Sequence, residues 1–198
     1  ELRRATGLAL SLFAAGGAAY YIRPSPYPRQ TFALTLADWR PALRFHLTWT
    51  VVFLAACTLI KWVMVSTIPS LAHHPVLEIR FLGYASPLAS LALMIGVYLL
   101  VSLLQEFTSR SMLQTSFALL LRGPRAPLWA IGLSNALYST FHMHYSFGVA
   151  IATFVLGIFF GTLWLRHPSL LAVSLAHFLA GFWCIEFLGA LALLGMKV

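Results

Sequence analysis

The sequence predicts an all-α, polytopic membrane helix bundle with about six transmembrane helices and one amphipathic segment. Of its 198 residues, 60% are hydrophobic and only 9% are charged, whereas soluble domains carry about a quarter charged residues. The hydrophobic residues occur in runs of about twenty, the length that an α-helix needs to cross a bilayer. The basic residues behind the net charge of +8 lie between these runs, so membrane topology explains them better than nucleic-acid binding does.

Six runs are long and apolar enough to predict membrane spans. They are Ala5–Ile22, Phe45–Ile68, Tyr84–Leu104, Ala126–Tyr145, Phe147–Leu165 and Ser169–Gly195. The connecting segments "RPSPYPRQ", "IPSLAHHP" and "RGPRAP" contain proline, which interrupts helices. Because no Gly or Pro occurs between Val97 and Leu121, we expect the third span to continue as one helix through Arg110. Its last part, Ser111–Leu121, is the amphipathic segment.

Charge asymmetry between the connecting segments predicts that both termini lie outside the cytoplasm. In that topology Glu106 lies at the cytoplasmic end of its helix, whereas His142 lies about 24 Å along the next span. The two residues share a site only if the third helix is displaced so that Glu106 lies deeper, or if Ala126–Tyr145 starts outside the bilayer or tilts strongly. The sequence leaves these alternatives open.

Glu106 is a candidate functional residue because an ionisable group inside a membrane is costly and usually faces the protein interior or a cavity. Its i, i+4 spacing from Arg110 predicts an ion pair on one helix. That pair is a structural salt bridge or part of a site. Gln105 lies about 100° around the helix from Glu106, so it faces elsewhere, into a cavity, if Glu106 turns toward Arg110.

Three of the histidines in the predicted spans and a second glutamate are further candidates. His142 and His144 are about 200° apart on a helix, so they face one site only if the helix ends there. His177 lies among small residues in "SLAHFLAGFW", where another helix can approach closely. Glu186 lies about 180° from His177, so we expect it to pair with another helix or with Lys61. Taken alone, each histidine fits a hydrogen-bonded packing role better than a functional one.

Together, the carboxylate and the histidines predict one polar pocket inside the bundle. A carboxylate in such a pocket can act as a general base toward water, while imidazoles orient the water or stabilise an oxyanion. Two imidazoles and a carboxylate are also a ligand set for a metal such as zinc. His142 and His177 are the candidate metal ligands.

In order and spacing, these residues resemble the motifs of the CPBP family of intramembrane proteases, which includes CAAX prenyl endopeptidases and bacteriocin-processing or immunity proteins. The family patterns EExxxR, FxxxH and HxxxN correspond to "QEFTSR" (Gln105–Arg110), "YSTFH" (Tyr138–His142) and "HFLAG" (His177–Gly181). The connecting segment Gly157–His177 is also similar, and the spacing selects His142 rather than His144. The resemblance implies a CPBP-like core in residues 83–198, preceded by membrane helices and an interfacial linker in residues 1–82.

The resemblance implies cleavage of a peptide bond in or beside the membrane, with Gln105, Glu106, Arg110, His142 and His177 as site residues. Tyr138 in place of the family's Phe is a mild departure from the pattern, and two further departures affect catalytic positions. The family's first Glu, thought to activate water, is Gln105 here, and a primary amide is no general base at neutral pH. The family's Asn, thought to help stabilise the oxyanion, is Gly181.

Three explanations stay open. The chain is a non-catalytic pseudoprotease, a scaffold or accessory subunit of a membrane complex. Alternatively it is an active peptidase with Glu106 as base, if the helix rotates or the motif register differs. Third, Gln105 is an engineered substitution that inactivates the protein. The departure at Gly181 argues against this explanation, because one engineered change would normally suffice. A transporter or channel is disfavoured, because the sequence shows no repeated half and no broken helix pair.

The expected partners are the lipid bilayer and either a membrane-tethered peptide or a membrane protein, with no nucleic acid. We expect the protein to be integral to the bacterial inner (cytoplasmic) membrane. The missing acid at Gln105 weakens the ligand set for zinc or another divalent metal, so no cofactor is the favoured expectation.

Overall fold

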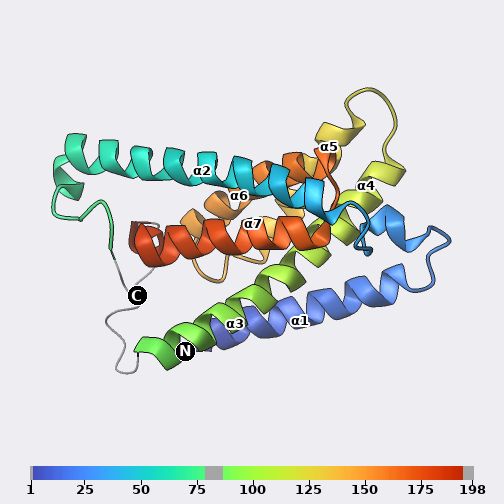
Figure 1. Cartoon of the computed structure of the whole chain (residues 1–198), viewed down its shortest axis with the longest axis horizontal. Coiled ribbons are helices and arrows are strands. Elements are labelled where there is room, and N and C mark those ends of the chain that lie inside the picture. Colours follow the sequence, from blue (N-terminus) through green and yellow to red (C-terminus); the bar gives the residue numbers. More distant parts are fainter. Residues whose placement is uncertain (1, 79–86, 194–198) are drawn as a thin grey trace.

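The computed structural model describes residues 2–78 and 87–193, and in these residues every regular element is helical, as predicted (Figure 1). The α-helices are α1 (Leu2–Ile22), α2 (Trp39–Thr67), α3 (Pro87–Glu106), α4 (Thr115–Leu120), α5 (Ala126–Thr140), α6 (Phe147–Arg166), α7 (Leu170–Phe182) and α8 (Ala190–Leu193). Two short 3-10 helices, η1 (Arg29–Phe32) and η2 (Pro69–Leu71), lie in the connections. Two π-helices, η4 (Phe107–Gln114) and η5 (Trp183–Phe187), directly follow α3 and α7.

The protein is an integral membrane protein with four helical stretches long and apolar enough to cross a bilayer. They are Trp39–Thr67, Leu91–Leu120, Phe147–Arg166 and Leu170–Phe187. The other two predicted spans correspond to shorter helices, the apolar stretch Thr6–Ile22 of α1 and the 15 residues of α5. The predicted span limits Tyr84 and Gly195 lie outside the described residues.

The third predicted span does continue as one helical stretch, through α3, η4 and α4, to Leu120. Glu106 is the last residue of α3, but the helical stretch continues as η4, so Glu106 lies near the middle of the apolar stretch Leu91–Leu120 and not at the end of the span, where the topology placed it. From Glu106 to Leu120 the helix rises by about 21 Å, and the 15 residues of α5 rise back by about 22 Å. The segment after α5, with His142, thus returns to the level of Glu106, as the displaced-helix alternative requires.

Local chemistry explains the connections on both sides of α5 and α6. The turn before α5 contains Gly123 at φ +97°, a conformation that costs glycine little. Pro127 lies in the first turn of α5, where its missing N–H is not needed. Ser146 and Ser169 cap α6 and α7 by accepting hydrogen bonds from Val149 N and Ala172 N.

Helix α7 packs between α2 and α3, and α1 lies beside α3 and η4 (Figure 1). The predicted close approach at the small residues of α7 is present. Ala176 and Ala180 are fully buried, and the hydroxyl of Tyr98 on α3 occupies the space that a side chain at Gly181 would need. Outward-facing apolar side chains on α2, such as Val51 and Ile60, suit a lipid environment.

A buried lysine joins α2 to the segment after α7. Lys61 Nζ donates a hydrogen bond to Leu188 O at 2.7 Å and lies 3.5 Å from Glu78 Oε1. Among the described residues, the ion-pair partner of Lys61 is therefore Glu78 rather than the expected Glu186. Glu186 itself is buried in η5.

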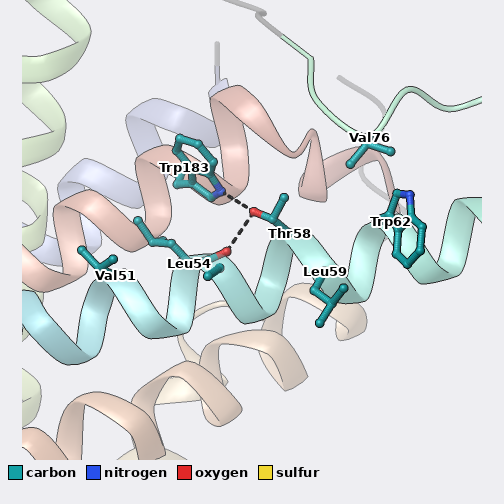
Figure 2. A pocket seen from close by; sticks show the side chains of 8 residues that line it. Val51, Leu54, Thr58, Leu59, Trp62, Val76 and Trp183 are labelled. Atoms are coloured by element: carbon teal, nitrogen blue, oxygen red, sulfur yellow. Dashed lines mark hydrogen bonds between the residues drawn. The ribbon is translucent and has the colours of Figure 1, made fainter.

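An apolar pocket of about 650 Å³ lies against α2 and η5 (Figure 2). Its lining is Val51, Leu54, Ala55, Thr58, Leu59, Trp62, Val76 and Trp183. Trp183 Nε1 donates a hydrogen bond to Thr58 Oγ1 at 3.0 Å, so these two polar groups already satisfy each other. The described residues that line the pocket include no acid or base, and the hydroxyl of Thr58 is bonded to Leu54 O and to Trp183 Nε1.

Gly181→Ala is expected to lower the free energy of unfolding by about 1–3 kcal/mol, because its Cβ meets the Tyr98 hydroxyl in a packed interface. Thermal denaturation in detergent measures the effect. Gly96→Ala on α3 is the matched control, because a Cβ there meets nothing within 4 Å and alanine is the better helix former. Equal melting temperatures for the two variants would contradict the close packing at Gly181.

Candidate functional site

The candidate site is built around the π-helix η4, where "TSRS" follows Glu106. Hydroxyl groups bond back to the helix: Thr108 Oγ1 donates to Leu104 O at 3.0 Å, and Ser109 Oγ donates to Gln105 O at 2.8 Å. Such side-chain donors satisfy carbonyl groups where the regular i, i+4 ladder is interrupted. Single π-helical turns inside α-helices occur frequently at functional sites. The sequence pattern did not predict this one.

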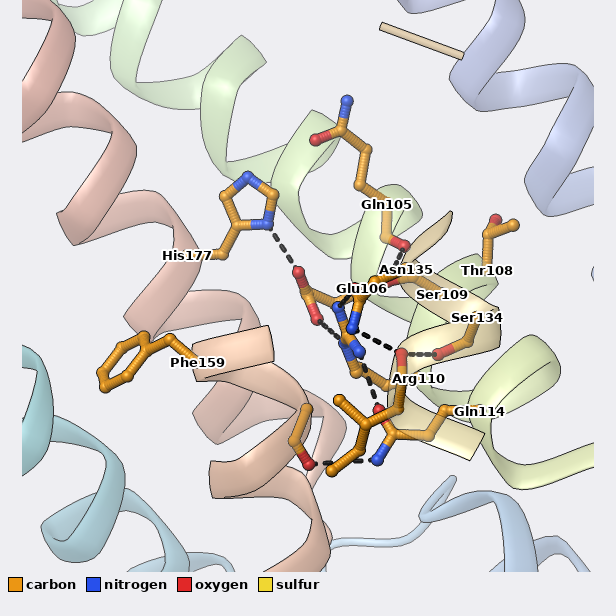
Figure 3. A network of polar contacts seen from close by, with 12 residues as sticks. Gln105, Glu106, Thr108, Ser109, Arg110, Gln114, Ser134, Asn135, Phe159 and His177 are labelled. Atoms are coloured by element: carbon orange, nitrogen blue, oxygen red, sulfur yellow. Dashed lines mark hydrogen bonds and ion pairs between the residues drawn. The ribbon is translucent and has the colours of Figure 1, made fainter. Parts of the chain in front are cut away.

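Glu106 is held on both oxygens by charged or polar partners. Arg110 Nε donates to Oε2 at 3.1 Å, and His177 Nδ1 lies 2.6 Å from Oε1 (Figure 3). The predicted i, i+4 ion pair is thus present, with 1% of each side chain exposed. A carboxylate with both oxygens engaged inside the bundle is a poor proton acceptor toward a separate water molecule.

The other two nitrogen atoms of Arg110 donate to neutral side chains. Nη1 donates to Gln114 Oε1 and Nη2 to Asn135 Oδ1, each at 2.7 Å. The two amides are fixed in turn, because Gln114 Nε2 donates to Gly161 O and Asn135 Nδ2 to Ile131 O. The Arg110 network therefore joins η4, α5 and α6 around one buried charge.

Glycines on α6 make room for that network. A Cβ at Gly157 would overlap the amide of Asn135, and one at Gly161 would lie 2.9 Å from Arg110 Nη1. Gly157 and Gly161 are four residues apart and so lie on one face of α6. This face is the close-approach surface that the "GIFFG" segment provides.

Gln105 points away from the Arg110 network, toward α1 (Figure 3). Its Nε2 makes a long hydrogen bond of 3.5 Å to Ser11 Oγ. The side chain lines a cavity of about 30 Å³ between α1, α3, η4 and the end of α5. The lining is Gly7, Leu10, Ser11, Ala14, Gln105, Thr108, Tyr138, Phe141, His142, His144 and Tyr145.

Three atoms of the cavity lining are buried without a hydrogen-bond partner among the described residues: Tyr138 Oη, His142 Nδ1 and His144 Nε2. Buried polar groups are nearly always hydrogen-bonded, so such atoms need an explanation. A water molecule needs about 10–15 Å³ and two to four polar partners. The cavity is large enough, and the residues that line it have such polar atoms, so a water fits there.

Both histidines reach this cavity because α5 ends at Thr140. Residues 141–145 form turns rather than helix, so the 200° separation that would keep His142 and His144 apart does not apply. The sequence predicted that His142 and His144 face one site only if the helix ends before them, and α5 does end there.

The predicted single pocket is divided into two by α3 and η4. Gln105 and His142 line the cavity, whereas Glu106, Arg110 and His177 belong to the Arg110 network. Among the described residues, no three His, Cys, Asp or Glu side chains lie close enough together to hold a metal. His142 and His177 thus have no third ligand beside them among the described residues, and the contact of His177 Nδ1 with Glu106 leaves Nε2 of His177 for another partner.

Sequence reasoning missed Gln114, Asn135, Tyr138 and Ser11 as members of these two sites. For Gln114 and Asn135 a signal was present. Gln114 follows Arg110 by four residues on the same helical stretch, and Asn135 is a polar residue inside an apolar run. Ser11 gave no such signal, because its contribution depends on where α1 packs.

Comparison with known families identifies one match. A family model described as "Type II CAAX prenyl endopeptidase Rce1-like" matches residues 87–183. The matched range contains all three motif segments, Gln105–Arg110, Tyr138–His142 and His177–Gly181. Searches of curated proteins and of solved structures found no significant match to the chain.

Arg110→Met is expected to lower the free energy of unfolding by about 3–5 kcal/mol, because it leaves the buried Glu106 carboxylate without its cationic partner. Thermal denaturation in detergent measures the loss. The double variant Glu106→Gln, Arg110→Met should regain part of it, since no charge then remains unpaired. Arg122→Met, at an exposed position, is the control and should change stability by less than about 0.5 kcal/mol. A loss no larger than that of the control would rule out the structural role of the pair.

Proposed function

Residues 87–183 belong to the Rce1-like family of type II CAAX prenyl endopeptidases, as their motifs indicated, and from this premise we propose that the chain is an intramembrane peptidase. Its proposed substrate is a peptide tethered to the membrane, such as the prenylated C-terminus that the family description names. The proposed reaction is hydrolysis of a peptide bond at the cavity beside Gln105. The proposed location is the bacterial cytoplasmic membrane.

The single observation that supports this proposal best is the cavity of about 30 Å³ with its unpartnered buried atoms. Hydrolysis needs a water held within hydrogen-bond reach of groups that orient it and accept its proton. Tyr138 Oη, His142 Nδ1 and His144 Nε2 are such groups, and each lacks another partner among the described residues.

The two sides of the η4 helix have different proposed roles. On the cavity side, His142 and Tyr138 orient the water or donate to the oxyanion that forms on the substrate carbonyl. On the opposite side, the ion pair of Glu106 and Arg110 and the contact with His177 hold α3, η4 and α7 in register. Glu106 is in this proposal a positioning residue, because both of its oxygens are engaged.

A non-catalytic membrane subunit is the second candidate. One observation favours it: the position that faces the cavity carries the amide of Gln105, and the lining contains no carboxylate. Under this alternative the buried network preserves a bundle that binds a membrane protein partner without cleaving it.

Cleavage of a panel of prenylated and membrane-tethered peptides by the protein in liposomes tests the proposal. Wild type is expected to cleave at least one peptide. Gln105→Glu should cleave about 10²-fold faster or more, because a carboxylate then faces the water. His142→Ala should lose activity by a similar factor.

The control is His73→Ala, which removes an exposed histidine of the 68–78 connection and should leave cleavage unchanged. Cleavage by Gln105→Glu alone would support the non-catalytic subunit, with position 105 as a silenced base. Equal rates for wild type and His142→Ala would exclude the cavity as the reaction site.

A further inference from the structure

We infer that Nε2 of His144 is the general base that accepts the proton of the hydrolytic water in the cavity beside Gln105. This inference rests on the proposed peptidase function and names the base that Gln105 itself does not supply. His144 lies outside the three motif segments, whose spacing selects His142.

The first argument is elimination among the groups that surround the cavity. Gln105 has an amide, which does not accept a proton near neutral pH. Glu106 lies on the other side of the helix and has both oxygens bonded, to Arg110 and His177. Among the described residues, the imidazoles are then the cavity-lining groups that can act as neutral bases.

The second argument is the tautomer of His144. Its Nδ1 lies 2.6 Å from Phe141 O. A carbonyl oxygen only accepts hydrogen bonds, so Nδ1 carries the hydrogen and donates it. In the neutral ring the lone pair is then on Nε2, which is the nitrogen that a base must present.

The third argument is where Nε2 lies. It is buried and has no hydrogen-bond partner among the described residues, although His144 lines the cavity. Gly7 of α1 also lines the cavity, and a Cβ on it would lie 3.9 Å from Nε2. Nε2 thus lies at the α5–α6 turn beside α1, and the hydroxyl of Tyr145 lies closer still to the same Gly7 position. A water in the cavity would satisfy Nε2.

The step balances without any further reactant. Water gives one proton to His144 Nε2 while its oxygen forms a bond to the carbonyl carbon of the substrate, and the C=O π electrons move to the carbonyl oxygen. When the tetrahedral intermediate collapses, the C–N bond breaks. The leaving nitrogen takes the proton from Nε2, which restores the neutral imidazole.

A double-mutant cycle between positions 105 and 144 tests the inference with the same liposome assay. In the wild-type background, His144→Ala should reduce kcat by about 10²–10⁴-fold. In the Gln105→Glu background the new carboxylate takes the proton, so His144→Ala should cost less than about tenfold. His144→Gln should behave like His144→Ala while keeping a polar side chain beside Phe141 O, and His73→Ala should have no effect in either background.

The outcomes separate the inference from the proposed function. If wild type and His144→Ala cleave at equal rates, the inference is wrong and the peptidase proposal stands. An equal loss in both backgrounds means that His144 is structural, which also overturns the inference. If only variants with Gln105→Glu cleave, or none do, the native chain is not the proposed peptidase, and the inference fails with it.

Discussion

A guanidinium group buried in an apolar bundle is the constraint on which the arrangement of the helices depends. With 1% of its side chain exposed, Arg110 has no access to bulk water and needs acceptors around its whole edge. These come from Glu106 on α3, from Gln114 on η4 and from Asn135 on α5, while α6 contributes two glycines that let its backbone approach. One charge therefore positions the continuous stretch of α3 and η4 against α5 and α6, as the fit of Asn135 against Gly157 shows most directly.

The commitment of Glu106 to Arg110 also determines what Gln105 does. Consecutive residues on a helix face different directions, so the residue before a fully engaged carboxylate is directed away from it. In this protein that direction leads to α1 and the cavity. The two sides of one helix therefore differ: the ionic side holds the bundle together, and the neutral side faces the cavity. Because Gln105 does not touch the ion pair, the packing of the bundle does not depend on an acid at position 105.

The helical class, the membrane setting and the i, i+4 ion pair were predictable from sequence, because each depends on local spacing and composition. The depth of Glu106 was not. Its expected place at a helix end came from hydropathy, which falls at "QEFTSRS", whereas buried partners allow that polar stretch to continue inside the bundle. The division of the polar residues between the Arg110 network and the cavity could not be predicted from the sequence either. It depends on the π-helix η4 and on the residue at which α5 ends. Glu186 was expected to pair with another helix or with Lys61, because its angle around the helix separates it from His177. The partner of Lys61 in the described structure is Glu78, whose position depends on how the connection after α2 folds.

The hydroxyl of Tyr98 occupies the volume beside Gly181 that any larger residue there would require. Two positions on different helices, 83 residues apart, therefore share one space, and only one of them can fill it. A residue larger than glycine at position 181 therefore requires the tyrosine side chain at position 98 to move or be replaced, or α3 to shift against α7. Conversely, a tyrosine in this orientation at position 98 requires a glycine at position 181. Among relatives that keep this backbone, the two positions should vary together, and a bulky residue at both should be absent.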